Sequence, residues 1–169
     1  VYHVEAGLRS FNRAMPEEIN RILTDHVSSL LFAPTQTAVK NLQNEGFKEN
    51  QIIFSGDVMY DNVLHYSNLS PFTFHLSPFI LATVHRDFNT DNPERLKNIL
   101  SALNTLAEKF NTKILFPVHP RTKKQLNNFQ FSIFNFQFSE PFSYLETLGA
   151  LQKANLVLTD SGGLQQEAF

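Results

Sequence analysis

The sequence predicts an α/β fold in which two mostly parallel sheets are covered by helices on both faces. Strand-like apolar segments alternate with segments of helical periodicity along the 169 residues, and repeated strand–helix units form parallel sheets. The continuous apolar run 79–84 is typical of a strand that is buried on both faces. Residues 67–78 are polar and contain two prolines, so we expect a linker there. The predicted parts are therefore 1–66, the linker 67–78, and 79–169.

The first part begins with an apolar, strand-like segment over 1–4. The segment Met15-Pro16-Glu17-Glu18 predicts the start of a helix, because proline suits the first turn and acidic side chains favour the positive end of the helix dipole. Apolar residues then follow at helical spacing: Ile19, Ile22, Leu23, Val27, Leu30 and Leu31. In the chain as given, we expect the apolar face with Ile19, Ile22 and Leu23 to be partly uncovered. A second helix is expected over 35–45, with Thr35 as N-cap and Gly46 as the stop. A strand over 51–54 and a helix over 58–65 complete this part.

The second part repeats the alternation. Asn92-Pro93-Glu94 opens a helix whose expected stripe is Leu96, Ile99, Leu100, Leu103, Leu106 or Ala107, and Phe110. A strand follows over 113–118. The alternation of Phe134, Phe136 and Phe138 predicts another strand with one apolar face. A helix over 144–153 and a strand over 155–159 lead into the glycine pair at 162–163, where a last helix is expected to begin.

Composition excludes several classes of protein and site. The hydrophobic fraction of 42% is too high for wholesale disorder, and the net charge of −2 argues against nucleic acid as the main partner. No apolar run is long enough to span a membrane. The absence of cysteine excludes disulfides, thiolate metal sites and a cysteine nucleophile. No pair of histidines has metal-ligand spacing, so no metal is expected.

Chemically useful residues follow four of the predicted strands. Glu5 follows the first strand, His85 and Arg86 follow 79–84, His119 follows 113–118, and the glycine-containing segment 160–163 follows 155–159. Active sites in open α/β sheets lie at the carboxyl ends of the strands. The sequence therefore predicts a functional site built from these strand ends.

The segment after the last strand has two interpretations. Gly162 and Gly163 allow a ligand to approach the backbone, whose free N–H groups bind anions, and Ser161 stands beside them. Glu167 lies one turn further on and has the chemistry to accept hydrogen bonds from sugar hydroxyls. The alternative is a plain strand–helix turn with Ser161 as the N-cap. In the same way, His85 can transfer protons and Arg86 can clamp phosphate, or the two can be an ordinary surface pair.

A group of carboxylates lies near the start of the chain. Glu5 follows a strand and Glu17 opens the next helix, and the loop between them is long enough to bring the two together. Closely placed carboxylates separate their pKa values, as acid–base pairs require. For one of Glu17 and Glu18, compensation of the helix dipole is a sufficient explanation. Arg21, one turn further on, adds a cation to the same region.

Five motifs together resemble the non-hydrolysing UDP-N-acetylglucosamine 2-epimerases over essentially the whole chain. The motifs are residues 3–10 (HVEAGLRS), 16–21 (PEEINR), 32–35 (FAPT), 84–86 (VHR) and 159–168 (TDSGGLQQEA). The resemblance implies a glycosyltransferase-B-like fold of two Rossmann-like domains, both incomplete in this chain, with the site in the cleft between them. It also implies interconversion of UDP-GlcNAc and UDP-ManNAc by elimination and re-addition of UDP, without metal or nicotinamide. A cytoplasmic enzyme that is a homodimer at full length would fit the family.

The resemblance also implies roles for individual residues. Glu5 and Glu17 correspond to the active-site carboxylates, and His85 to a catalytic or phosphate-facing histidine. The residues expected to bind UDP or the sugar are Arg21, Arg86, His119, Ser161, Gly162, Gly163 and Glu167. Two departures stand out: Phe88 occupies the usual position of a glutamate before Asn89, and the family's first nucleotide-binding turn and a further catalytic aspartate would lie upstream of Val1.

We therefore expect an internal fragment that is inactive by itself. Four alternatives remain open at this stage. The chain can come from a 2-epimerase of a related UDP-2-acetamido sugar, from a hydrolysing epimerase that releases free ManNAc, or from a retaining glycosyltransferase of the same fold, or it can bind UDP without catalysis.

Overall fold

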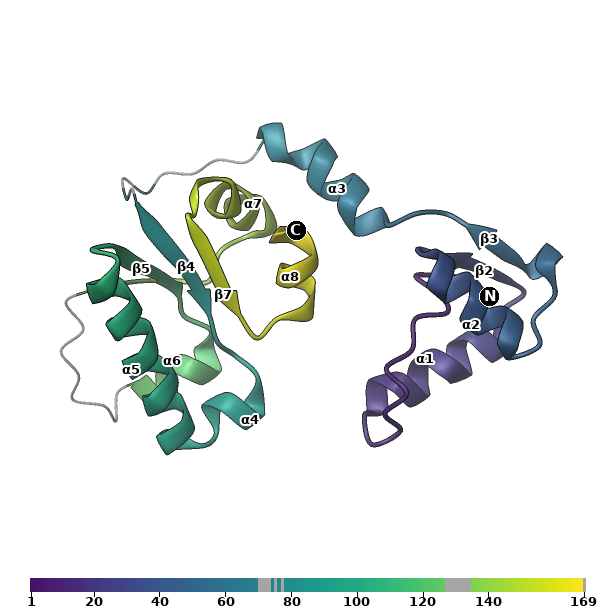
Figure 1. Ribbon diagram of the computed structural model, residues 1–169, viewed down its shortest axis with the longest axis horizontal. Helices are drawn as coiled ribbons and strands as arrows, with labels where there is room; N and C mark the ends of the chain where they lie inside the picture. The colour runs from purple at the N-terminus through teal and green to yellow at the C-terminus, as the bar shows by residue number, and fades with distance from the viewer. Residues whose placement is uncertain (70–73, 75, 77, 127–134, 169) are drawn as a thin grey trace. The chain divides into compact units, whose positions relative to one another are not determined.

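The computed structural model describes residues 1–69, 74, 76, 78–126 and 135–168, and the chain is divided into two compact units, Val1–Asn62 and Val63–Phe169 (Figure 1). Both units are built on parallel sheets, as the sequence predicts. Much of the predicted linker and Phe134 of the predicted phenylalanine alternation lie outside the described residues. The domain boundary at residue 66 stays a prediction.

Unit 1 contains a three-stranded parallel sheet in the order β1-β2-β3. The strands are β1 (Tyr2–Val4), β2 (Leu30–Ala33) and β3 (Ile52–Phe54), and the helices are α1 (Pro16–Val27), α2 (Gln36–Asn44) and α3 (Val58–Tyr66), which continues into unit 2. Short 3₁₀ turns lie at Glu49–Gln51 in unit 1 and at Ser67–Leu69 in unit 2. Thr35 caps α2 as predicted, because its side chain accepts a hydrogen bond of 3.1 Å from the Ala38 N–H. The small core of this unit joins α2 to the sheet through Ala6, Leu31, Ala33, Ala38 and Leu42.

The prediction for α1 is wrong in one respect, the residue at which the helix ends. The helix ends at Val27, and Leu30 and Leu31 belong to the middle strand of the sheet. The apolar face of α1 is partly uncovered in this chain, as expected: Leu23 is 58% exposed and Val27 is 67% exposed. The buried residues of α1 are instead two acids, Glu18 and Asp25. Helical periodicity thus identified the helix but extended the pattern into the following strand.

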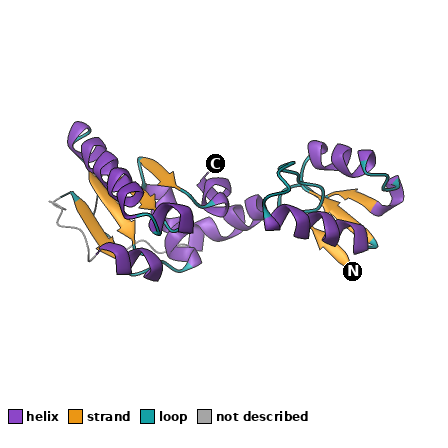
Figure 2. Ribbon diagram, turned by 90° about the horizontal axis from the view of Figure 1, so that it is seen from below, coloured by secondary structure: helices purple, strands orange, loops and turns teal. Residues whose placement is uncertain are grey.

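Unit 2 contains a four-stranded parallel sheet in the order β6-β5-β4-β7. Its strands are β4 (Phe79–Thr83), β5 (Lys113–Pro117), β6 (Phe136–Ser139) and β7 (Leu156–Thr159). Its helices are α4 (Asp87–Thr90), α5 (Pro93–Lys109), α6 (Pro120–Leu126), α7 (Tyr144–Lys153) and α8 (Gly162–Ala168). The short helices α4 and α6, which follow β4 and β5, were not predicted from the sequence (Figure 1). Figure 2 shows the helices of the chain in purple and its strands in orange.

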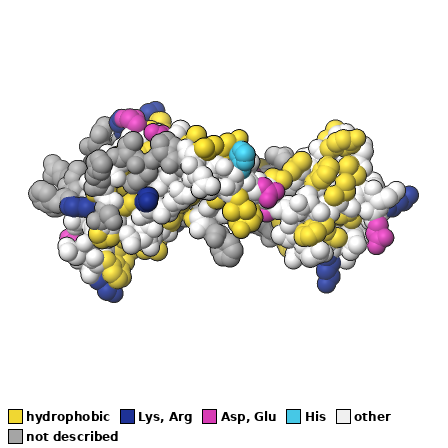
Figure 3. Space-filling model, turned by 90° about the horizontal axis from the view of Figure 1, so that it is seen from above, with side chains coloured by type: hydrophobic (Ala, Val, Ile, Leu, Met, Phe, Trp, Pro, Cys, Tyr) yellow, Lys and Arg dark blue, Asp and Glu magenta, His cyan; other side chains and the backbone are white. Residues whose placement is uncertain are grey.

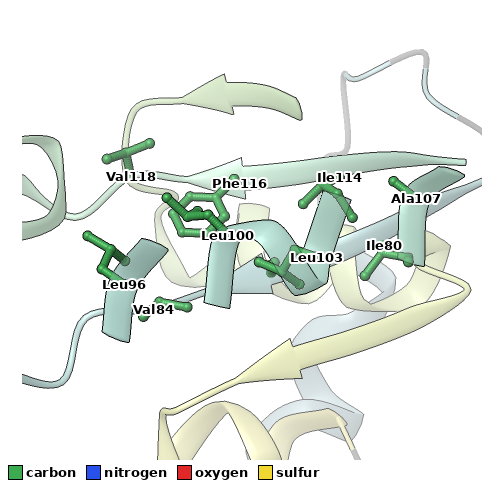
Figure 4. Packing of buried hydrophobic residues seen from close by; sticks show 10 residues of the cluster. Ile80, Val84, Leu96, Leu100, Leu103, Ala107, Ile114, Phe116 and Val118 are labelled. Carbon is green, nitrogen blue, oxygen red and sulfur yellow. The ribbon is translucent and has the colours of Figure 1, made fainter. Parts of the chain in front are cut away.

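Helices cover both faces of this second sheet, which explains the continuous apolar run of β4. Alternate residues of β4 point to opposite sides, so Ile80 packs in the core under α5 while Leu81 packs in the core with Ala150 of α7. Figure 4 shows Leu96, Leu100, Leu103 and Ala107 of α5 directed at the strands. Phe110 is a correction: it is the C-cap residue of α5 and is 59% exposed.

Candidate functional site

A pocket of about 270 Å³ lies in unit 2 at the carboxyl ends of the strands. Five of the predicted site residues line it: His85, His119, Ser161, Gly163 and Glu167. The remaining lining residues are Leu81, Thr83, Pro117, Pro141, Phe142, Thr147 and Leu164. The pocket thus combines a few polar groups with an apolar wall, the usual composition of a small-molecule site.

The structure confirms the N-cap interpretation of the glycine-containing segment after β7, and the ligand-binding interpretation stays a prediction. Ser161 caps α8, because its Oγ accepts a hydrogen bond of 3.3 Å from the Leu164 N–H, and the same residue lines the pocket. A Cβ added at Gly162 would meet no atom within 4 Å, and one at Gly163 would meet only the Ser161 Oγ at 3.9 Å. The two glycines therefore leave open space beside the backbone. Within the described structure, close packing does not require glycine at either position.

Asp160 connects this segment to the loop that carries His85. Its carboxylate accepts hydrogen bonds from the backbone N–H groups of His85, at 3.1 Å, and Arg86, at 2.9 Å, and from the Asn89 side-chain amide at 3.0 Å. Strands β4 and β7 are neighbours, and just before the two loops Thr83 and Thr159 share a hydroxyl hydrogen bond of 2.6 Å. Sequence reasoning did not select Asp160 as a site residue, although its place between a strand and two glycines is the signal that could have found it.

The other predicted residues of unit 2 divide between the pocket wall and its surroundings. The His85 and His119 rings have centroids 5.8 Å apart. Burial raises the pKa of the Glu167 carboxyl above its usual range. Arg86 is not a lining residue, and its Nε donates to the Asp160 carbonyl at 3.2 Å. Gly162 also lies outside the lining, so the structure gathers five of the predicted residues and leaves these two beside them.

In unit 1, Glu5 and Glu17 are both exposed, and within the described part of the chain no hydrogen bond or ion pair joins them. Glu5 has a φ of 69°, a conformation that L-residues adopt at a cost and that often marks functional sites. The carboxylate that organises the loop before α1 is Glu18, which accepts the N–H groups of Ser10 at 3.0 Å and Phe11 at 2.9 Å.

Glu18 and Arg21 therefore belong to one local arrangement. The hydrogen bond from the Ser10 N–H lowers the pKa of the buried Glu18 carboxyl, against the opposing effect of burial. Arg21 lies 3.4 Å from Glu18 as an ion pair and is partly exposed. Dipole compensation alone does not explain Glu18, because its carboxylate closes the loop that follows β1.

The remaining polar groups after β1 form a buried charge network. Arg9 lies 2.7 Å from Asp25 and 2.7 Å from Glu45, and its side chain is buried. Asp25 is fully buried and also contacts the His3 ring and the Gly7 N–H. The Arg9 side chain is thus occupied by ion pairs inside unit 1.

The described residues bear on metal and membrane binding in two ways. They contain no cluster of three or more His, Asp or Glu side chains that could hold a metal ion. Over the same residues, every helix is too short or too polar to cross a membrane. On the face drawn in Figure 3, the Lys and Arg side chains are scattered.

The fold is that of an α/β protein of the glycosyltransferase-B-like class, with a pocket at the strand ends of unit 2. The chain belongs to the UDP-N-acetylglucosamine 2-epimerase family, because the sequence model of that family matches residues 1–169. This confirms the family and the fold class that the motifs predicted.

Relatives of known name support the assignment. The chain is 48% identical to the UDP-2,3-diacetamido-2,3-dideoxy-D-glucuronate 2-epimerase of Pseudomonas aeruginosa, covering 100% of this chain and 49% of that protein. It is 45% identical to the UDP-N-acetylglucosamine 2-epimerase of Methanocaldococcus jannaschii, covering 99% of this chain and 50% of that protein. The chain spans about half the length of the curated relatives it matches.

Solved structures agree with these relatives. The crystal structure of the M. jannaschii enzyme in complex with UDP-GlcNAc and UDP superimposes with a TM-score of 0.83 at 45% identity, covering 99% of this chain and 50% of that chain. S. aureus MnaA in a co-structure with UDP gives a TM-score of 0.84 at 30% identity, covering 99% of this chain and 47% of that chain.

Proposed function

We propose that this chain is part of a UDP-sugar 2-epimerase that interconverts UDP-GlcNAc and UDP-ManNAc. The observation that carries the proposal is the unit 2 pocket, where His85, His119, Ser161, Gly163 and Glu167 meet in a chain of this family. The proposal concerns the full-length enzyme, which we take to be a cytoplasmic homodimer that needs no metal or nicotinamide.

Unit 2 holds UDP in this proposal. The open backbone at Ser161, Gly162 and Gly163 accommodates the diphosphate, because no side chain fills the space beside the glycines. His85 faces the phosphates, and Arg86 lies next to it in sequence as a further cation. Glu167 accepts hydrogen bonds from the ribose hydroxyls, and His119 lies close to the nucleotide sugar across the same pocket.

Unit 1 supplies the proton chemistry. One of Glu5 and Glu17 removes the C2 proton of the sugar while the bond from C1 to the UDP oxygen breaks, which gives 2-acetamidoglucal and UDP. Re-addition of the UDP oxygen to C1, with return of a proton to the opposite face of C2, completes the epimerisation. Both carboxylates are exposed and so are free to meet a substrate, and Arg21 is the nearby cation in α1 that we assign to the phosphate region.

A related substrate is the second candidate. The relative from P. aeruginosa is named for a UDP-2,3-diacetamido-2,3-dideoxy-D-glucuronate, and it is 48% identical to this chain. Phe88, at the position where the family usually has a glutamate, is 59% exposed on α4 beside Asn89. Replacement of a carboxylate by an aromatic ring at this place changes what sugar substituents can be recognised.

Incubation of the full-length enzyme with UDP-GlcNAc in deuterium oxide tests the proposal. Elimination and re-addition predict UDP-ManNAc that carries deuterium at C2, which NMR detects. Release of free ManNAc and UDP would indicate the hydrolysing reaction instead. Turnover of the 2,3-diacetamido glucuronate substrate alone would favour the second candidate, and UDP binding without any turnover would contradict the proposed epimerase.

A further inference from the structure

The Asp160 carboxylate lies against the His85 side chain as well as against the backbone around it. Its Oδ1 is 3.1 Å from the His85 Nδ1, while Oδ1 and Oδ2 each accept from the His85 N–H at 3.1 Å. Oδ2 also accepts from the Arg86 N–H and from the Asn89 amide. One carboxylate thus holds the loop that carries His85 by hydrogen bonds and lies 3.1 Å from one nitrogen of its ring.

The surroundings of Asp160 keep it in this position. Its side chain is 11% exposed, whereas the His85 side chain is 37% exposed and lines the pocket. The Arg86 Nε donates to the Asp160 carbonyl, which closes the loop from the other side. The other titratable groups at His85 are His119, with its ring centroid 5.8 Å away, and Glu167 in the same pocket.

We propose that Asp160 is a positioning residue that holds the proton of neutral His85 on Nδ1 and so presents Nε2 to the substrate. A carboxylate beside Nδ1 favours that tautomer, because the ionised oxygens only accept hydrogen bonds and Nδ1 must then be the donor. In the neutral ring, Nε2 is then a hydrogen-bond acceptor. When His85 takes up a second proton, Nε2 becomes a donor to a diphosphate oxygen, and Asp160 balances the added positive charge.

The position of Asp160 in the chain also connects His85 with the proposed diphosphate site. It follows β7 and directly precedes the Ser161–Gly163 segment, so the residue that orients His85 is covalently joined to the proposed diphosphate site. The catalytic part of the inference rests on the proposed function. The tautomer of His85 is a property of the folded protein and does not depend on it.

The test combines nitrogen-15 NMR of the histidine rings with kinetics in the full-length enzyme. We expect neutral His85 in the wild type to carry its proton on Nδ1. Asp160→Asn should lose this preference, because the side-chain NH2 group of asparagine, a hydrogen-bond donor, can take the place of the carboxylate oxygen that faces Nδ1. The variant should lose about 10²-fold in kcat, with the KM for UDP-GlcNAc changed by less than about threefold. Glu140→Gln is the matched control, since this exposed carboxylate pairs only with Lys123 among the described contacts and lies outside the pocket lining.

The outcomes separate the inference from the proposed function. A wild-type His85 with its proton on Nε2 overturns the inference even if Asp160→Asn fails to fold. A folded Asp160→Asn with an unchanged kcat, or with a lower kcat and an unchanged tautomer, overturns it as well. A third outcome removes the proposed function and leaves the positioning of His85 intact. In this outcome the wild-type enzyme has the Nδ1 tautomer but does not turn over UDP-GlcNAc, and Asp160→Asn abolishes the tautomer.

Discussion

Replacement of Gly7 by alanine should destabilise unit 1 strongly. Gly7 has a φ of 78°, which costs an L-residue about 1–2 kcal/mol. A Cβ there would lie 2.5 Å from the Ala38 carbonyl oxygen and 2.8 Å from the Leu42 Cγ, both on α2. Overpacking of this kind costs about 1–3 kcal/mol, so the sum is about 2–5 kcal/mol. Domains are stable by only about 5–15 kcal/mol, so this is a large fraction.

Gly46→Ala is the matched control for this prediction. Gly46 has a φ of 91°, and a Cβ there meets nothing within 4 Å, so only the backbone cost applies. Native-state hydrogen exchange of the β2 amides reports the stability of unit 1 separately from that of unit 2. Gly7→Ala should lower the opening free energy by about 1–3 kcal/mol more than Gly46→Ala. Equal losses in the two variants would refute the argument that α2 closes against the backbone at Gly7.

Three further predictions concern the sites. Ser161→Asp should weaken UDP binding at least about 10-fold in isothermal titration, because the new carboxylate would face the diphosphate. Asn92→Asp adds the same charge at the N-cap of α5 and should leave UDP binding unchanged. Equal UDP affinities of the two variants would place the nucleotide elsewhere. Glu5→Gln and Glu17→Gln should each lower turnover about 10²–10⁴-fold with UDP affinity kept, and normal deuterium incorporation at C2 in both would exclude them as proton-handling groups. The pKa of the Glu18 carboxyl is lowered in the folded state, so Glu18 contributes stability at pH values above the ordinary glutamate pKa of 4.5, and this contribution is lost as the pH falls through the folded pKa. In urea unfolding, Glu18→Gln should therefore be less stable than the wild type at neutral pH and should lose less stability on acidification. Parallel curves of stability against pH for the two proteins would contradict this.

Local signals in the sequence were sufficient for most elements of the fold. The helix over 144–153 has the predicted bounds, because Ser143 and Glu146 form a capping box that defines its start. The run 79–84 forms the buried strand β4, since a parallel strand under two helical layers must be apolar on both sides. Polar residues and glycines after parallel strands converge because those strands end at one edge of the sheet, and five predicted site residues accordingly line one pocket.

The sequence by itself thus determined the α/β class, the two parallel sheets, the family and the strand ends that carry the pocket. Only the tertiary structure decided which charged residues are buried. Asp25, Arg9 and Glu18 lie inside unit 1, because their partners come from other segments or from backbone N–H groups that no sequence pattern reveals. The same holds for Asp160, whose role beside His85 depends on the pairing of β4 with β7. Periodicity reports which residues share a face, but the partner across that face is fixed only when segments distant in sequence fold together.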